Sequence, residues 1–427
     1  MFNLPFYRAS CLAAQIAYQF GKNKNFNVRS FDEKIANLLT ASSNNRPKLK
    51  PSRIAYLATV CYDIGGHTKC IKNLAKSLNG YYEQRLFLTQ KSETEISATN
   101  TIKIISQFMS IDGIDALLFP KFEEKVKNFA DRIIDFSPKT LLVYIHPDDV
   151  FGVAVMALLK KTTDIKIVFF NHASHYPCLG MSFSDDILEA IPTTEKVTQK
   201  QRGLKNTKII GIQSLAKNET IYYSKYELTE LKEKLGIPVD NLLTMSGGSA
   251  YKFFDNDKTS EYFNFIRHLL TKDQNIFHVI ISHFNNKQKA VIENIFSLVP
   301  NIRKRLIIIP YNTNFDKYFQ MADVFIDSFP VSSALTQIDL MRNKVATVVK
   351  INHKVPCFSF HEYQMPNYPY MFEKVEDMEN AILELLHNEQ KRNVIIQKNY
   401  NFWLKTYESD IFRDKIIQLI EGEKDEY

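Results

Sequence analysis

The fold is decided by residues 322–339, which read ADVFIDSFPVSSALTQID. The apolar run Ala322–Ile326 predicts a buried strand that ends at Asp327, and Pro330 prevents the strand from continuing. A hydroxyl-rich turn and a helical pattern follow. The free backbone N–H groups and the dipole of a helix N-terminus favour phosphate. A carboxylate further along, Asp339, can accept hydrogen bonds from a ribose diol, so the stretch indicates a site for a nucleotide diphosphate.

Short apolar runs on both sides of this stretch predict further strands that alternate with helices. Near-continuous apolar strands of this kind are typical of parallel sheets covered on both faces. Two sets in succession predict an α/β protein of two Rossmann-like doubly wound domains that face each other across a cleft. The predicted strands are Arg53–Cys61, Gln84–Thr89, Thr140–Ile145, Lys166–Phe170 and Lys208–Ile212, then Leu242–Ser246, Phe277–Ser282, Arg305–Ile309, Val324–Asp327 and Ala346–Lys350.

The order of these patterns predicts four segments. Residues 1–52 form an N-terminal helical extension that ends in a polar linker, and residues 53–235 form the first domain. Residues 236–395 form the second domain, which starts at a Gly-Ile-Pro turn signal. Residues 396–427 form a long amphipathic helix that we expect to pack back towards the first domain.

The composition indicates a soluble globular enzyme. The chain has 427 residues, of which 45% are hydrophobic and 24% charged, and this length favours two domains. No apolar run approaches the roughly 18 residues that span a bilayer. The five cysteines are odd in number and lack CxxC spacing, which indicates reduced thiols and neither a zinc site nor a disulfide framework. We therefore expect a cytoplasmic protein, with contact to the inner face of the membrane left open.

The net charge of +7 allows several partners. A mildly basic protein suits an anionic sugar nucleotide, a phospholipid surface or nucleic acid, but the same charge also describes an ordinary solvated surface. Because charge alone does not choose among these, the candidate partners come from the motifs at the strand ends.

In doubly wound sheets, ligands bind beyond the carboxyl ends of the strands. Three predicted strand ends of the first domain carry histidines, and a histidine there can act as a general base on an acceptor hydroxyl. The spacing matches no standard metal template, so we expect no metal. The candidate residues are Gly65 and Gly66, which allow close backbone approach and are donor-binding candidates, and the catalytic candidates His67, His146, His172 and His175.

In the second domain, the strand Leu242–Ser246 leads into a loop of small residues that ends in a cation. Small residues let the backbone approach a ligand, and a lysine at this position can reach a phosphate. The candidate donor-binding residues of this loop are Ser246, Gly247, Gly248, Tyr251 and Lys252, and those of the later stretch are Asp327, Ser332, Ser333, Thr336 and Asp339.

These two segments together resemble the donor domain of GT-B glycosyltransferases, and most closely the O-GlcNAc transferase family and its bacterial relatives. In that family a Tyr-Lys pair contacts the nucleotide diphosphate, and here the pair is Tyr251-Lys252. A strand-end Asp then leads through a His-Thr-Thr turn to the Asp that holds the ribose. Asp327 and Asp339 keep that spacing, but the turn reads Ala334-Leu335-Thr336, so only its last threonine is kept. This departure puts the phosphate grip and the identity of the nucleotide in question.

The first domain resembles bacterial glycosyltransferases that carry a GGH-T motif after the first strand and an Asn-His-Ala-x-His motif later. Here these motifs are Gly65–Thr68 and Asn171–His175. The resemblance implies a cytoplasmic, metal-independent and inverting transferase, without a cofactor, that uses a nucleotide sugar such as a UDP-sugar. The acceptor is a glycan, a lipid-linked glycan or a protein, nucleic acid is not an expected partner, and the oligomeric state stays open.

Three other readings remain. A non-catalytic GT-B subunit that binds an acceptor would explain the altered turn at Ala334-Leu335. A GT-B epimerase would convert a nucleotide sugar without an acceptor, and a glycerol-phosphate transferase would consume CDP-glycerol. A hydride-transfer enzyme is not expected, because the first loop lacks the GxGxxG pattern.

Overall fold

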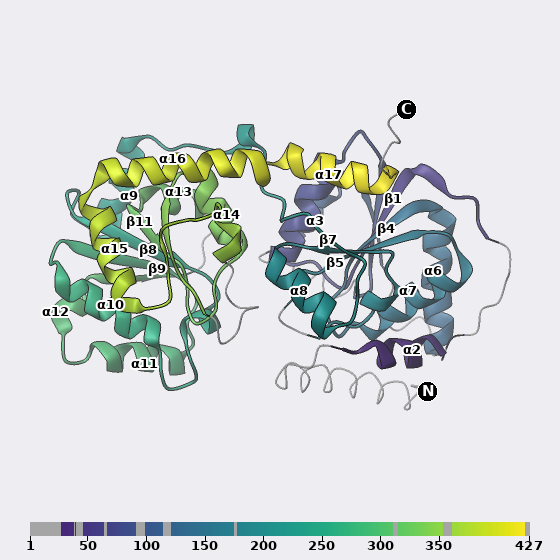
Figure 1. The fold of residues 1–427 in the computed structure, drawn as a ribbon, viewed down its shortest axis with the longest axis horizontal. Coiled ribbons are helices and arrows are strands. Elements are labelled where there is room, and N and C mark those ends of the chain that lie inside the picture. The colour runs from purple at the N-terminus through teal and green to yellow at the C-terminus, as the bar shows by residue number, and fades with distance from the viewer. Residues whose placement is uncertain are drawn as a thin grey trace. The chain divides into compact units, whose positions relative to one another are not determined.

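The computed structural model describes residues 27–37, 39, 46–63, 66–90, 99–113, 121–174, 177–310, 315–352 and 361–422. Contacts within the chain divide it into two compact units (Figure 1). Unit 1 consists of Met1–Gln213 and Ser409–Tyr427, and unit 2 consists of Ser214–Glu408.

Unit 1 is built on a parallel sheet whose described strands follow the order β3-β2-β1-β4-β5-β6-β7. The strands are β1 (Lys50–Ala58), β2 (Glu83–Leu88), β3 (Ser110–Gly113), β4 (Pro138–Tyr144), β5 (Lys166–Phe170), β6 (Asp186–Glu189) and β7 (Thr207–Ile209). The helices are α2 (Arg29–Asn37), α3 (Gly66–Ser77), α5 (Thr99–Ile105), α6 (Phe122–Phe136), α7 (Val150–Thr162), η1 (Met181–Phe183), α8 (Pro192–Gln201) and α17 (Ser409–Glu421).

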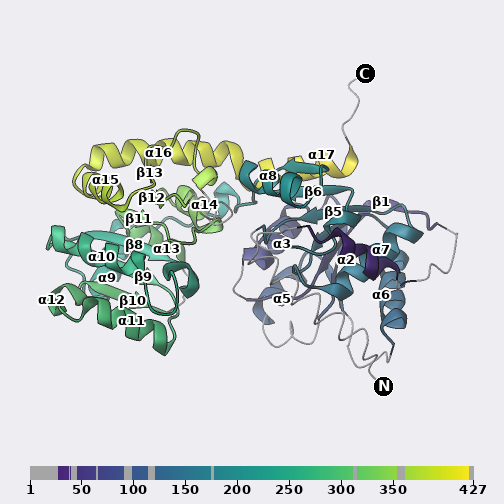
Figure 2. The same cartoon turned by 60° about the horizontal axis from the view of Figure 1, so that its bottom comes forward.

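Side chains of β1 fill two cores on opposite faces of this sheet. Ala55 and Leu57 pack with residues of α6 and α7, whereas Ile54 and Tyr56 pack with residues of α3 and α17. Successive side chains of a strand point to opposite faces, so a strand buried on both faces must be apolar at nearly every position. From the expected N-terminal extension the structure describes α2, which lies against α7 (Figure 2), while residues 1–26 lie outside the described residues.

Unit 2 is built on a second parallel sheet, in the order β10-β9-β8-β11-β12-β13 among the described residues. The strands are β8 (Leu242–Gly247), β9 (Ile276–Ile281), β10 (Leu306–Ile309), β11 (Val324–Ile326), β12 (Ala346–Lys350) and β13 (Met371–Phe372). The helices are η2 (Lys217–Glu219), α9 (Lys225–Lys234), η3 (Ala250–Phe253), α10 (Glu261–Lys272), α11 (Asn286–Phe296), α12 (Pro300–Arg303), α13 (Phe315–Met321), α14 (Leu335–Arg342), η5 (His361–Tyr363), α15 (Val375–His387) and α16 (Glu389–Thr406).

Strand order places one switch point in each sheet. The first strand of unit 1, β1, lies between β2 and β4, and the first strand of unit 2, β8, lies between β9 and β11. The connection that leaves β1 and the one that leaves β4 run to opposite faces of the sheet, and so do those that leave β8 and β11. In a doubly wound sheet this arrangement opens a crevice at the carboxyl ends of the two strands. The two parallel sheets with helices between their strands confirm the predicted fold class of two Rossmann-like domains.

Every strand predicted from the sequence is present, with shifted ends in most cases, and three further strands were missed. The missed strands are β3, β6 and β13. The strand β6 is buried although it begins with Asp186 and ends with Glu189, because ion pairs and hydrogen bonds from other elements satisfy both carboxylates. With a charged residue at each end, this strand lacks the long apolar run from which the other strands were predicted.

The division into units differs from the predicted segment boundaries. Residues 214–235 and 396–408 belong to unit 2, because α9 packs on α13 and α16 packs on α14 and α15. The predicted C-terminal helix is interrupted at Tyr407, and only α17 packs on unit 1, against α3 (Figure 1). In the described part of the chain no helix combines the length and the apolarity that crossing a bilayer demands.

Candidate functional site

In unit 2, the turn after β11 is organised around the carboxylate of Asp327. This side chain is fully buried and accepts hydrogen bonds from the hydroxyls of Ser332 and Ser333 and from the Ser333 backbone N–H at 3.1 Å. Burial raises the pKa of Asp327, and the two serine hydrogen bonds oppose that rise. Asp327, Ser332 and Ser333 therefore lie together as predicted, but the serine hydroxyl hydrogens point to Asp327.

Gln337, which the sequence analysis did not single out, holds the same turn. Its Nε2 donates to Asp327 at 3.0 Å and to the Ser333 carbonyl at 2.7 Å. Its Oε1 accepts from Gln364, which in turn accepts from Asn399 of α16 at 3.1 Å. All of these side chains are buried. Each is an ordinary polar residue in a helix or loop, so only the fold reveals the chain of hydrogen bonds.

Lys252 lies against this turn. It belongs to η3, after β8, and its Nζ donates to the carbonyl of Ser332 at 3.2 Å. Burial lowers the pKa of Lys252, and the charge of Asp327 raises it. The structure therefore brings the two predicted donor segments together at the switch point between β8 and β11, with the ammonium beside the turn. The neighbouring Tyr251 is 56% exposed.

The loop between β8 and η3 contains two glycines with different requirements. Gly248 has φ of +153°, a conformation that side chains rarely adopt, and a Cβ there would lie 3.4 Å from Cδ of Lys252. Its N–H donates to the Ile281 carbonyl at 3.1 Å. A Cβ on Gly247 would make only an ordinary contact, 3.7 Å from the oxygen of Ile281. The loop therefore needs a glycine at the second position.

Ser246 is part of a buried chain of hydrogen bonds. Its hydroxyl donates to the Ile326 carbonyl at 2.6 Å and accepts from the hydroxyl of Tyr262 at 2.6 Å. His278 lies 2.9 Å from both the Tyr262 and Thr244 hydroxyls, and burial lowers its pKa to about 3, so the imidazole is neutral. Ser246 was predicted to bind the donor, yet its hydroxyl already links β8 to β11.

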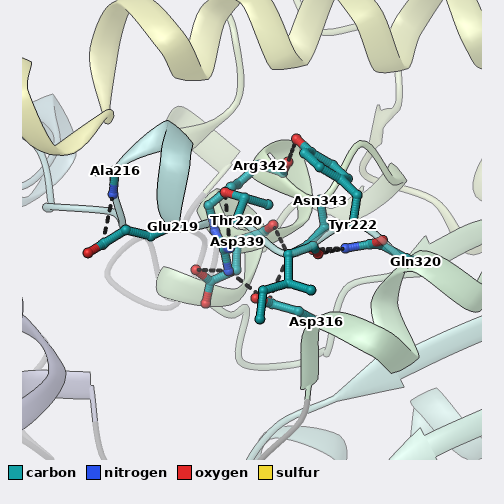
Figure 3. A network of polar contacts seen from close by, with 10 residues as sticks. Ala216, Glu219, Thr220, Tyr222, Asp316, Gln320, Asp339, Arg342 and Asn343 are labelled. Atoms are coloured by element: carbon teal, nitrogen blue, oxygen red, sulfur yellow. Dashed lines mark hydrogen bonds and ion pairs between the residues drawn. The ribbon is translucent and has the colours of Figure 1, made fainter. Parts of the chain in front are cut away.

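Asp339, the predicted ribose residue, lies in the polar network drawn in Figure 3. Its carboxylate faces the buried Arg342 at 3.5 Å, and Arg342 also pairs with Asp316 of α13 at 2.7 Å. The guanidinium further donates to Thr220 at 3.4 Å. Asp339 retains 13% of its side-chain exposure, and Thr336, one turn earlier on α14, is half-buried. Arg342 therefore links the segment that enters unit 2 to α13 and α14, and Asp339 is a carboxylate partner of this arginine.

In unit 1, three of the predicted histidines gather at the carboxyl edge of the sheet. The ring of His67 lies 5.4 Å from that of His146 and 5.4 Å from that of His172, measured between centroids. They follow β1, β4 and β5, and β1 and β4 flank the switch point of this sheet. Gly66 is exposed at the first position of α3. His175 and Gly65 lie outside the described residues.

The hydrogen bonding of His67 determines its tautomer. Its Nε2 lies 2.9 Å from the carbonyl oxygen of Val60, and since a carbonyl only accepts, Nε2 carries the hydrogen. Burial lowers the pKa of His67 to about 4, the Val60 hydrogen bond opposes this, and His146 adds to it. The ring is therefore neutral near pH 7, and its unprotonated Nδ1 can accept a hydrogen bond.

Asp149, at the start of α7, joins three strand ends beneath this cluster. It is buried and accepts from the hydroxyls of Thr59 at 2.6 Å and Thr89 at 2.7 Å. The Thr59 oxygen accepts the backbone N–H of His146 at 2.7 Å. The Asp149 carboxylate also caps α7 by accepting a hydrogen bond from the N–H of Gly152. The carboxylate thereby holds the backbone that carries His146.

Glu189 supports the turn that carries His172. It is buried and accepts from Asn171 Nδ2 at 2.9 Å and from the Thr198 hydroxyl at 2.6 Å. Burial raises the pKa of Glu189, and these hydrogen bonds lower it. Arg202 donates to Thr198 and to the carbonyl of Ser174, at the other end of the turn. Among the described residues, no group of three or more His, Cys, Asp and Glu side chains is arranged to hold a metal ion.

Comparisons by sequence and by structure differ in outcome. Neither a family model nor a curated protein matches the sequence. Solved structures do match. HepE from Anabaena, crystallised with UDP and glucose, is 10% identical and has a TM-score of 0.66, over 87% of this chain and 99% of HepE.

Two further solved structures bear on the resemblance and on one alternative. A mutant O-GlcNAc transferase from Thermobaculum terrenum is 10% identical with a TM-score of 0.60, over 95% of this chain and 76% of that protein. A protein described as a putative UDP-N-acetylglucosamine 2-epimerase from Listeria monocytogenes is 13% identical with a TM-score of 0.55, over 88% of this chain and 97% of that protein. At these identities the likeness shows the fold, and the chain has the GT-B fold.

Proposed function

We propose that this protein is a glycosyltransferase that moves a sugar from a UDP-sugar to an acceptor. The observation that carries the proposal is the ammonium of Lys252, held 3.2 Å from the Ser332 carbonyl at the switch point of the unit 2 sheet. A cation beside a strand-turn-helix segment suits a diphosphate. The same fold in HepE, a protein crystallised with UDP and glucose, favours UDP as the nucleotide.

Lys252 and the N-terminus of α14 would stabilise the diphosphate as it leaves the sugar. Charge develops on the leaving group in the transition state, and prearranged donors in a dry site stabilise it strongly. No side chain caps the N-terminus of α14. In this proposal Thr336 and Asp339 meet the ribose, and Asp327 with Gln337 keeps the turn in place. Neither a metal nor a cofactor is needed for this arrangement.

The histidine cluster of unit 1 would receive the acceptor. A neutral imidazole can take a proton from the attacking hydroxyl, and the unprotonated Nδ1 of His67 is available in the right form near pH 7. Direct attack by that hydroxyl displaces the diphosphate in one step, which inverts the anomeric centre. His146, His172 and His175 are the other candidates for the base.

The test is the melting temperature of the full chain with UDP, UDP-glucose, GDP, CDP-glycerol and dTDP. A ligand at a hundred times its Kd stabilises the native state by about 2.7 kcal/mol, so UDP and UDP-glucose should raise the melting temperature clearly. Lys252→Met removes the charge but keeps the length, and should weaken UDP binding about tenfold or more. Lys258→Met, at an exposed lysine of the same unit, should leave it unchanged.

Two results would contradict the proposal. If none of the nucleotides stabilises the protein, the donor site does not exist, and the non-catalytic reading stands. If Lys252→Met responds as the unsubstituted protein does, the cation has been assigned wrongly.

The likeness to the Listeria protein supports an epimerase as the second candidate. An epimerase converts UDP-N-acetylglucosamine without any acceptor. Proton NMR of UDP-N-acetylglucosamine incubated with the protein would detect that conversion.

A further inference from the structure

Tyr62 extends the histidine cluster with an exposed aromatic ring. It follows β1 and is 37% exposed, whereas Tyr56 and Tyr144, in the strands below, are 0% and 1% exposed. Its ring lies 6.1 Å from that of His146 at an interplanar angle of 7°, and meets the ring of His67 edge-on at 5.8 Å. The imidazole of His146 is therefore stacked with Tyr62, and the partly exposed ring of Tyr62 lies beside the candidate base at the carboxyl edge of the sheet.

The backbone that carries these two rings is held in place. The N–H of Tyr62 donates to the hydroxyl of Thr68 at 3.1 Å, and Thr68 is buried in α3. His146 is held through Thr59 and Asp149, as described above. A ring carried on a backbone fixed in this way loses less conformational entropy when a ligand packs on it than a ring on a mobile loop does.

The residues next to Tyr62 and His146 in the sequence include carboxylates and no lysine or arginine, which disfavours an anionic ligand. His67 is neutral near pH 7. Asp63 directly follows Tyr62 and is exposed, although one of its carboxylate oxygens accepts the backbone N–H of Thr101 at 2.8 Å, and Asp148 lies two positions after His146 and is exposed. Carboxylates repel phosphate, but they accept hydrogen bonds from hydroxyl groups. An aromatic face, the neutral imidazole of His67 and carboxylates close by in the sequence together match a molecule that has an apolar face and a rim of hydroxyls.

We propose that the ring of Tyr62, with His146 stacked against it, is a platform for a neutral sugar ring, so that the acceptor of this protein is a glycan. The C–H bonds on one face of a sugar ring pack on the electron-rich face of an aromatic ring, and the sugar hydroxyls then reach His67, whose ring lies 5.8 Å from that of Tyr62. This inference rests on the proposed function, because it names the acceptor of the same site. It chooses a glycan over a phosphate-bearing lipid or a peptide.

The experiment is binding of the full chain to a printed array of neutral oligosaccharides, with phosphorylated oligosaccharides and glycan-free peptides as other arms. The unsubstituted protein should bind a set of neutral glycans. For the best of these, Tyr62→Ala should weaken binding about fivefold to tenfold, whereas Tyr62→Phe, which keeps the ring, should stay within about twofold. Tyr226→Ala removes a tyrosine that is 77% exposed in unit 2 and should change nothing.

Several outcomes would overturn the platform. They are binding only to phosphorylated glycans, binding only to peptides, binding to nothing, or equal binding by Tyr62→Ala and the unsubstituted protein. The melting temperature with UDP separates this failure from failure of the proposed function. A Tyr62→Ala protein that still responds to UDP is folded and keeps its donor site, so a glycan result obtained with it concerns the acceptor alone.

Discussion

At the scale of single residues, hydrogen-bond partners decide what each candidate can do. The sequence correctly brought Asp327, Ser332, Ser333 and Lys252 to one place, because all four follow strands that end at the same edge of a sheet. It did not show that the serine hydroxyls donate to Asp327. A hydroxyl in a turn reads the same whether it faces a ligand or a buried carboxylate, and only tertiary structure distinguishes the two cases.

The buried imidazole of His278 makes the stability of unit 2 depend on pH. Its pKa is lowered to about 3 in the native state, against 6.5 for an ordinary histidine. Between these pH values the unfolded chain binds a proton that the native chain does not, so stability falls as the pH falls. One such group contributes about 1.4 kcal/mol per pH unit at most. The loss is greatest towards the acid end of the interval.

The measurement is the free energy of unfolding in urea from about pH 7 to about pH 5, for the unsubstituted protein and for His278→Gln. The variant should lose less stability per pH unit, whatever its stability at neutral pH. His283→Gln, at an exposed histidine of the same unit, should keep the original slope. Identical slopes for all three proteins would mean that His278 is not held neutral.

At the scale of elements, apolar patterning was sufficient for ten of the described strands and insufficient for three others. Strands β5 and β12 match their predicted limits to the residue, because both are apolar runs with nearly every side chain buried. By contrast, β6 carries charges that only its neighbours satisfy, and β13 has two residues. The two glycines after β8 predicted a loop whose backbone can approach a ligand closely. The sequence did not show which of the two glycines has a backbone conformation that other residues rarely adopt.

The loop between β8 and η3 gives a paired prediction. Gly248→Ala places a side chain at φ of +153°, and this should destabilise the protein by about 1–3 kcal/mol. Gly247→Ala meets only an ordinary contact and should cost clearly less. The check is the midpoint of urea unfolding for the two variants. Equal losses at both positions would show that the backbone conformation of Gly248 imposes no special requirement.

At the scale of the whole molecule, the chain passes from unit 1 to unit 2 after Gln213 and returns after Glu408. The return separates two consecutive helices. Ile395 of α16 packs in a core of unit 2, whereas Phe412 of α17 packs in a core of unit 1. The sequence pattern of residues 396–427, which predicted one long amphipathic helix, gave no sign of this division. Both helices must bury one face, and the pattern does not show which unit that face packs against.

Each unit therefore depends on its own part of the C-terminal segment. Phe412→Ala should open a cavity in unit 1, and Ile395→Ala one in unit 2, at a cost of about 2–5 kcal/mol each. Hydrogen exchange of backbone amides reports local opening. The first variant should speed exchange in β1 and α3 and leave β8 and β11 unchanged, and the second should do the reverse. If either variant sped exchange equally in both sheets, the units would open together, and neither would owe its stability to a helix of its own.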